Sequence, residues 1–143
     1  MASDGSSGNV ARLAAIAREF HERQHLSTAH DVAWLVHEEA EMSLVPGDDH
    51  VLRGRARIID WLLEERQAFV YTGEVEHYEL LDQTTLLLSG RARFVVQHGF
   101  ADSTVFWVDV FLDELLWRVR TFPSAAEARD AYDTGKVAAR SSG

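Results

Sequence analysis

The 143-residue sequence contains no cysteine. This absence excludes a disulfide framework, a thiolate zinc site, an iron–sulfur cluster and a cysteine nucleophile. A chain of this length buries about two-thirds of the surface that its unfolded form exposes, so it can fold as one domain without such a cross-link. Glycine-rich phosphate loops and the G-x-S-x-G nucleophile pattern are also missing, and the sequence therefore gives no support to phosphate handling or serine hydrolysis.

Basic residues are scarce, with 14 Lys+Arg against 23 Asp+Glu and a formal net charge of −9. An acidic chain repels polyanions, which disfavours binding to nucleic acids or to anionic membranes. No apolar run approaches the roughly 20 residues that a membrane helix needs. Residues 1–8 lack the basic and apolar regions of a secretory signal, so a cytoplasmic location is expected.

Hydrophobic periodicity predicts helices at the start and strands afterwards. Helical spacing covers residues 10–24, a capping-box pattern starts a second helix at Thr28, and a third helix follows Gly54. Period-two alternation marks residues 40–44, and longer strands are expected at 70–81, 84–98, 103–113 and 115–122, before a last helix after Pro123. This order predicts a single α+β domain over residues 9–135 with a mostly antiparallel sheet, a disordered leader at 1–8 and a disordered tail at 136–143.

Three segments carry a resemblance to a known family. They are the strand that begins at Glu39, the segment LRGRARIIDW at residues 52–61, and the segment LWRVRTFPSAAEA at residues 116–128. Together they resemble nuclear-transport-factor-2-like domains of the SnoaL-like and ketosteroid-isomerase-like type. The resemblance implies a cone-shaped, curved sheet wrapped around the N-terminal helices (a cystatin-like α+β barrel), an internal pocket, and often a homodimer formed through the outer sheet face.

The group includes isomerases, epoxide hydrolases, dehydratases, polyketide cyclases and non-catalytic members, so the resemblance does not fix the function. At the positions of the isomerases' tyrosine and general-base aspartate, this chain has Phe20 and Leu44. Thr121 replaces the last-strand aspartate of the cyclases and hydrolases. Of the known catalytic acids, only the isomerases' second acid is matched, by Asp109.

The central strands supply the remaining candidates for catalysis. The hydrolases' Arg-x-Asp pair corresponds to Arg91 and Arg93, so its arginine is kept and its aspartate is lost. Counting back from the expected turn at residues 99–101 places Asp109 opposite Arg91 to Arg93. His77 shares its parity with Val75 and is expected to face inward. These residues predict an acid (Asp109), an electrostatic stabiliser (Arg91 or Arg93) and a base (His77); the alternative is a cross-strand ion pair that holds the sheet register.

Large apolar side chains indicate where a ligand would lie. If Asp109 points inward, strand alternation directs Phe106, Val108, Val110 and Leu112 outward, where so apolar a row suggests contact with a second subunit. The residues predicted to line an internal pocket for a small apolar molecule are Phe20, Trp34, Met42, Leu44, Trp61, Trp107, Phe111, Trp117 and Thr121. The alternative for each of them is plain core filling.

The first helix contains an H-E-x-x-H pattern made by His21, Glu22 and His25. On a helix, the two histidines share a face and could bind zinc, with His30 or Glu38 as a third ligand. The helix is expected to end near His25, which weakens this geometry, and we therefore predict that no metal is bound.

Two functional hypotheses follow. The first is an enzyme that needs no cofactor and uses acid–base chemistry, as an isomerase, cyclase, dehydratase or epoxide hydrolase, on a small apolar, polyketide-like or terpenoid-like molecule. The second is a non-catalytic ligand-binding or dimerisation module. A metal-dependent hydrolase that uses His21 and His25 is a distant third.

Overall fold

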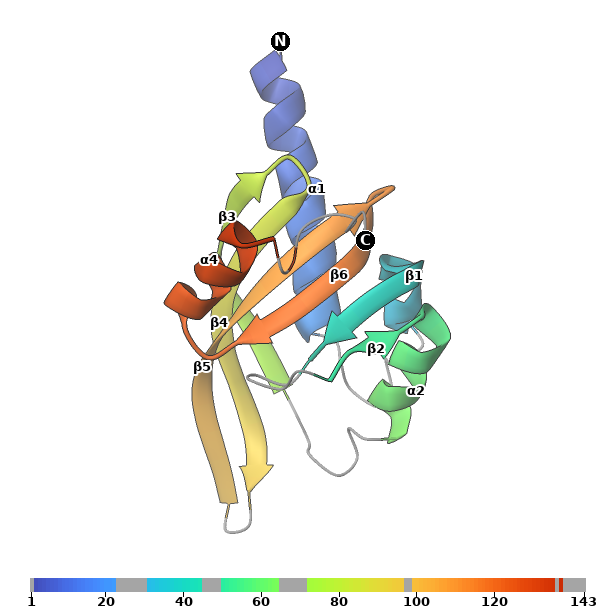
Figure 1. Ribbon diagram of the computed structural model, residues 1–143, viewed down its shortest axis with the longest axis vertical. Helices are drawn as coiled ribbons and strands as arrows, with labels where there is room; N and C mark the ends of the chain where they lie inside the picture. Colours follow the sequence, from blue (N-terminus) through green and yellow to red (C-terminus); the bar gives the residue numbers. More distant parts are fainter. Residues whose placement is uncertain are drawn as a thin grey trace.

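The computed structural model describes residues 2–22, 31–44, 50–64, 72–96, 99–135 and 137. Figure 1 shows the arrangement of the helices and strands in these ranges. They are, in order, α1 (Ala2–Glu22), the 3-10 helix η2 (Asp31–Leu35), β1 (Val36–Ser43), β2 (Leu52–Arg53), α2 (Arg55–Glu64), β3 (Thr72–Asp82), β4 (Thr85–Val96), β5 (Gly99–Leu112), β6 (Leu115–Phe122) and α4 (Ala125–Asp133).

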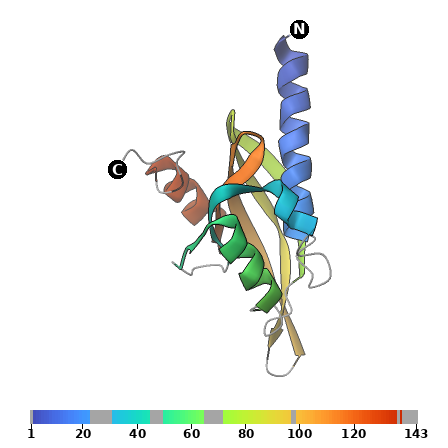
Figure 2. The same ribbon diagram turned by 90° about the vertical axis from the view of Figure 1, so that its right-hand side faces the viewer.

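The strands form one open, six-stranded sheet in the order β2-β1-β6-β5-β4-β3. All neighbouring strands are antiparallel except β1 and β6, which are parallel. Figure 2 shows α1 and α2 on one face of this sheet and α4 on the other. The predicted α+β class with a mostly antiparallel sheet is therefore confirmed. Within the described ranges, no helix is long and apolar enough to cross a membrane.

The main core lies between the sheet and α1 with α2. Alternating residues of the long strands supply it, so Leu86 and Leu88 of β4 are fully buried in this core while Leu87 lies on the opposite face. On β5 the same alternation buries Val105 and Trp107. The predicted inward direction of alternate β5 residues is confirmed, and it places Asp109 on the α1 side of the sheet.

A second, smaller core covers the outer face. Val108 packs with Ala128 and Ala131 of α4, and both Val108 and Val110 are 0% exposed within the single chain. Val108 and Val110 are therefore covered within the single chain, with α4 packed over Val108, and their burial requires no second subunit. Val137, expected in the tail, is buried in the same cluster.

The helix predicted from Thr28 differs from the structure. Residues 28–30 lie outside the described ranges, and the described part is only the short η2 before β1 begins at Val36. Val36, Ala40 and Met42 are all buried. Val36 precedes Ala40 by four positions, a spacing that fits both one face of a helix and the alternation of a strand, so the pattern alone does not distinguish the two. At the N-terminus, α1 begins at Ala2 and includes most of the segment predicted as a leader.

A hydrogen bond between Tyr132 and Asp82 also joins α4 to β3. Tyr132 Oη donates to Asp82 Oδ2 at 2.7 Å. Burial tends to raise the pKa of Asp82, but hydrogen bonds from Tyr132 and the Thr84 N–H outweigh it and lower the pKa below 3.8. The hydrogen bond to Asp82, helped by burial, raises the pKa of Tyr132 to about 12.

We expect Tyr132→Phe to lower the free energy of unfolding by about 0.5–1 kcal/mol at pH 7. Because the pKa of Asp82 is lowered in the folded protein, the bond adds stability at pH values above the unfolded carboxyl pKa, and this stability is lost as the pH falls through the folded pKa. Because the pKa of Tyr132 is raised, the bond also adds stability that is lost as the pH rises through about 12. The difference between wild type and variant, measured by urea unfolding, should therefore shrink below pH 3.8 and above pH 10. Tyr78→Phe, on an exposed tyrosine, is the control; a Tyr132→Phe deficit that is independent of pH would contradict the assignment.

Candidate functional site

A buried histidine–aspartate pair joins α1 to the middle of the sheet. His21 lies in the last turn of α1, and its Nε2 is 2.8 Å from Asp109 Oδ2 of β5. Both side chains are 0% exposed. The long helix crosses the sheet so that its C-terminal turn meets the inner face of β5, which brings together two residues 88 positions apart (Figure 1).

Aromatic rings hold the histidine in place. The ring of Trp107 stacks on His21 with centroids 4.3 Å apart and planes 24° apart. Phe20 meets the same imidazole edge-on at 5.3 Å. Trp107 precedes Asp109 by two positions, so strand alternation puts the stacking ring and the carboxylate on the same face. The imidazole therefore has a fixed plane and one fixed hydrogen bond.

Each member of the pair also has a polar atom with no partner. Across the described ranges, no group hydrogen-bonds to His21 Nδ1 or to Asp109 Oδ1, and both atoms are buried. Buried polar atoms are nearly always hydrogen-bonded in native proteins, so these two require an explanation. If the carboxylate of Asp109 is ionised, it can only accept, and His21 Nε2–H is the donor. In that tautomer of a neutral imidazole, Nδ1 carries a lone pair that could accept a proton.

The next residue, Glu22, ties the same end of α1 to the edge of the sheet. Its Oε2 accepts a hydrogen bond from the backbone N–H of Val75 at 2.8 Å. Val75 lies at a register shift of β3, where an irregular strand leaves backbone groups without ladder partners. His21 and Glu22 therefore dock α1 onto β5 and β3 respectively.

These contacts involve two residues of the H-E-x-x-H pattern that could bind zinc. His21 and Glu22 are engaged with Asp109 and Val75, while His25 and His30 lie outside the described residues. Glu38 is exposed on β1. Among the residues that the structure describes, no group of three or more His, Cys, Asp or Glu side chains is placed to hold a metal ion.

The predicted pairing of Asp109 with Arg91 or Arg93 is wrong. Asp109 lies opposite Leu86 on β4, while Arg91 pairs with Thr104 and Arg93 with Asp102. Val96 pairs with Gly99, so β5 has already begun at Gly99, where the turn at 99–101 was expected. That difference shifts the register, and alternation places both arginines on the face opposite Asp109.

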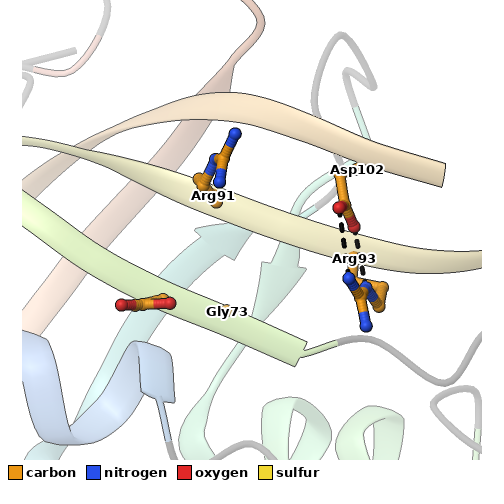
Figure 3. Close-up of a pocket in the computed structure, with 5 residues that line it drawn as sticks. Gly73, Arg91, Arg93 and Asp102 are labelled. Carbon is orange, nitrogen blue, oxygen red and sulfur yellow. Dashed lines mark hydrogen bonds and ion pairs between the residues drawn. The ribbon is translucent and has the colours of Figure 1, made fainter.

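The two arginines instead line a polar pocket of about 340 Å³ with Gly73, Glu74 and Asp102 (Figure 3). Arg93 holds Asp102 through Nε–Oδ1 and Nη2–Oδ2 contacts of 2.8 and 3.2 Å. The hydrogen bond from Arg93 lowers the pKa of Asp102, and the reciprocal bond raises that of Arg93. This pocket is separate from the His21–Asp109 pair.

His77 does not face inward as predicted. It pairs with Ser89 and lines a small pocket with Ala125 and Arg129 of α4, on the outer face. A register shift between Val75 and His77 inserts an extra residue, so Val75 points into the core while His77 points away. Parity counted across such a bulge gives the wrong face.

Most of the predicted lining residues are buried on the α1 side. Phe20, Met42, Leu44, Trp107 and Phe111 belong to the main core, and Trp61 packs partly against it. These positions are compatible with either core filling or contact with a ligand.

Three other predicted lining residues have different surroundings. Thr121 is buried and donates its hydroxyl hydrogen to the Ser43 carbonyl oxygen at 2.9 Å. Trp117 lies beneath the guanidinium of Arg118, 4.3 Å from the ring centroid. Trp34 is 82% exposed, so its predicted place in an internal pocket is wrong; it projects from η2, where a continuous α-helix was expected.

Sequence reasoning missed His21 as the partner of Asp109. A signal was available, because His21 follows Ala17 by four positions and Ala14 by seven, on the buried face of the helix. A histidine on that face requires a buried partner. The strand position of Asp109 then made it the candidate.

Comparison with known proteins identifies the architecture. No protein-family model matches the sequence, and no curated protein is significantly similar to it. Three solved structures show the likeness. An NTF2-like protein from Anabaena variabilis has a TM-score of 0.62 at 10% identity, covering 87% of this chain and 93% of its own. A candidate polyketide cyclase from Sinorhizobium meliloti has a TM-score of 0.63 at 12% identity, covering 75% of this chain and 93% of its own. An LEH-like epoxide hydrolase from M. tuberculosis has a TM-score of 0.68 at 12% identity, covering 90% of this chain and 94% of its own. At these identities, the comparison shows a shared fold.

Proposed function

Because the chain has the NTF2-like fold, we propose that it is a small-molecule pocket protein of the SnoaL-like type that performs cofactor-independent acid–base chemistry on a small apolar ligand. The observation that supports this most directly is the buried 2.8 Å contact between His21 and Asp109, with no partner for His21 Nδ1 among the described residues. A desolvated, oriented imidazole is a suitable general base.

In this proposal, Asp109 acts through His21 and His21 moves the proton. The carboxylate accepts Nε2–H and fixes the tautomer in which Nδ1 holds the lone pair, while Trp107 fixes the plane of the ring. Isomerisation, cyclisation, dehydration and epoxide opening all need such a proton transfer. The similarity to a candidate polyketide cyclase and to an epoxide hydrolase supports this range of reactions. His77, Arg91 and Arg93 take no part, because they lie on the other face of the sheet.

We propose that Phe20, Met42, Leu44, Trp107 and Phe111 provide the apolar surroundings of the ligand, since all five are buried on the side of the sheet that carries His21. The homodimer through the outer sheet face also stays a proposal. Sedimentation of the purified chain tests it, with a species of twice the chain mass as the expected result.

Ring opening of 5-nitrobenzisoxazole tests the proposed base, because the reaction needs only removal of a C–H proton as the N–O bond breaks, and it releases a coloured phenolate. We expect His21→Asn to lower the rate by about 100-fold, the usual contribution of a positioned base. His77→Asn is the matched control on the outer face and should keep the wild-type rate. Thermal unfolding of each variant confirms that it is folded. A His21→Asn protein that is folded and as fast as wild type would refute the proposal.

The second candidate is a non-catalytic binding or dimerisation module. The observation that favours it is the complete burial of both His21 and Asp109, which is what a purely structural pin would show. It predicts that 5-nitrobenzisoxazole binds saturably, as followed by tryptophan fluorescence, while wild type and His21→Asn open it equally slowly.

A further inference from the structure

The outer face of the sheet carries a second concave site, distinct from the His21–Asp109 pair. It lies where β3, β4 and β5 run side by side and encloses about 340 Å³, within the size range of small-molecule pockets. Its lining combines two arginines, Arg91 and Arg93, with two carboxylates, Glu74 and Asp102. The fifth residue, Gly73, has no side chain and leaves that part of the lining open.

One of the two arginines, Arg93, already forms an ion pair within the pocket. Arg93 and Asp102 are cross-strand partners on β4 and β5 and make two parallel contacts of 2.8 and 3.2 Å. Such a fork-to-fork pair has defined geometry and neutralises both charges. Arg93 and Asp102 therefore form one wall of the pocket, as Figure 3 shows, and offer little net charge to a ligand.

The other two charged residues, Arg91 and Glu74, have no such partner in the described ranges. Arg91 and Glu74 are directly opposed partners across β3 and β4, a position in which opposite charges usually attract each other. Yet neither makes an ion pair or side-chain hydrogen bond with any residue in the described ranges. The charge of Arg91 acts on Asp102 only through space, where it helps to lower the pKa of that carboxyl. In Figure 3 the Arg91 side chain extends toward β5, away from β3. The pocket thus presents one available cation and one available anion.

We propose that this pocket binds a small zwitterion of the amino-acid class, with its carboxylate on Arg91 and its ammonium on Glu74. The formal charges of the four lining side chains cancel, which favours a ligand without net charge. A phosphate would meet Arg91 but would also face two carboxylates at close range. β-Alanine, a small zwitterion whose two charges are separated by a few bonds, is the probe that we choose from this class.

Titration of the ¹⁵N-labelled protein with β-alanine tests this assignment, followed through the Arg91 Nε–H and the Gly73 and Glu74 amide signals. Propionate keeps only the carboxylate and propylamine only the ammonium. We expect saturable shifts with β-alanine and binding at least about tenfold weaker with either analogue, since each loses one charge-assisted contact. Arg91→Gln and Glu74→Gln should each weaken β-alanine binding by about tenfold, whereas Arg53→Gln, which breaks an exposed ion pair with Glu41, should not.

Three results would overturn the zwitterion site. The first is binding of propionate or inorganic phosphate as tight as that of β-alanine. The second is β-alanine binding that Glu74→Gln leaves unchanged, and either of these two would mean a simple anion site at Arg91. The third is the absence of any saturable shift. The variants lie on the exposed sheet surface, and thermal unfolding confirms that each is folded. This outcome is independent of the proposed chemistry at His21, which lies on the opposite face.

Discussion

Substitution of Asp109 by alanine is expected to lower the free energy of unfolding by about 3 kcal/mol or more, as in other buried pairs that lose one partner. His21 has no exposed surface, and Asp109 is its only hydrogen-bond partner in the described ranges. Without the carboxylate, both ring nitrogens would be buried and unpartnered. The cavity left beside Trp107 would add to this loss, because the stacked ring has little freedom to fill it.

Urea unfolding of wild type and variant measures the effect. Asp102→Ala is the control on the same strand, because its carboxylate is 49% exposed and solvent screens its ion pair with Arg93, so a much smaller loss of stability is expected. The double variant His21→Leu with Asp109→Ala removes both polar groups and should lose less than the two single variants added together. A single Asp109→Ala loss no larger than that of Asp102→Ala would contradict the role of the pair in joining α1 to β5.

Asp109→Asn should affect the stability of the fold and the proposed chemistry to different extents. The asparagine amide oxygen can still accept Nε2–H from His21, so the fold should survive better than in Asp109→Ala. The negative charge that would stabilise a protonated imidazole is lost, so the proposed proton transfer should slow even though the contact remains. A structural pin needs only the contact, and the pair of variants therefore distinguishes the two candidate functions.

Local patterns in the sequence were sufficient for much of the fold. Alternation along residues 105–111 predicted which side chains enter the core. The capping box at the last helix was also correct: Ser124 Oγ accepts the Glu127 N–H at 3.2 Å, and Ser124 Oγ donates to the Glu127 carboxylate at 3.0 Å. Each of these features depends on residues within a few positions of one another, which is the range that periodicity reports.

The candidate site depends on features beyond that range. The face of His77 depends on one inserted residue after Val75, and the partners of Arg91 depend on the residue at which β5 begins. A single-residue error at either point reverses or shifts every later assignment on the strand. The contact between His21 and Asp109 joins α1 to β5 across most of the chain, and only the three-dimensional packing of the helix on the sheet determines it.

Gly90→Ala is expected to cost about 3 kcal/mol of unfolding free energy, at the upper end of the range for overpacked sites. An added Cβ at this position would lie 1.9 Å from the carbonyl oxygen of Glu74 and 3.0 Å from Val75 Cα. Both obstacles are backbone atoms, so no side-chain rotation can relieve the clash and β3 must move. Gly90 and Val75 are cross-strand partners at the bulge, where glycine allows a close approach of the two strands.

The effect should extend to the proposed active site, because the Val75 N–H is held by Glu22 next to His21. Hydrogen exchange should accelerate in β3 relative to β6, and ring opening of 5-nitrobenzisoxazole should slow as the end of α1 loses its contact with β3. Ser89→Ala, at the neighbouring position on β4, meets no such obstacle and should change stability by less than about 1 kcal/mol. If Gly90→Ala matched Ser89→Ala in stability and in β3 exchange, the close approach of the strands would not restrain β3. In that case the substitution would not be expected to move His21.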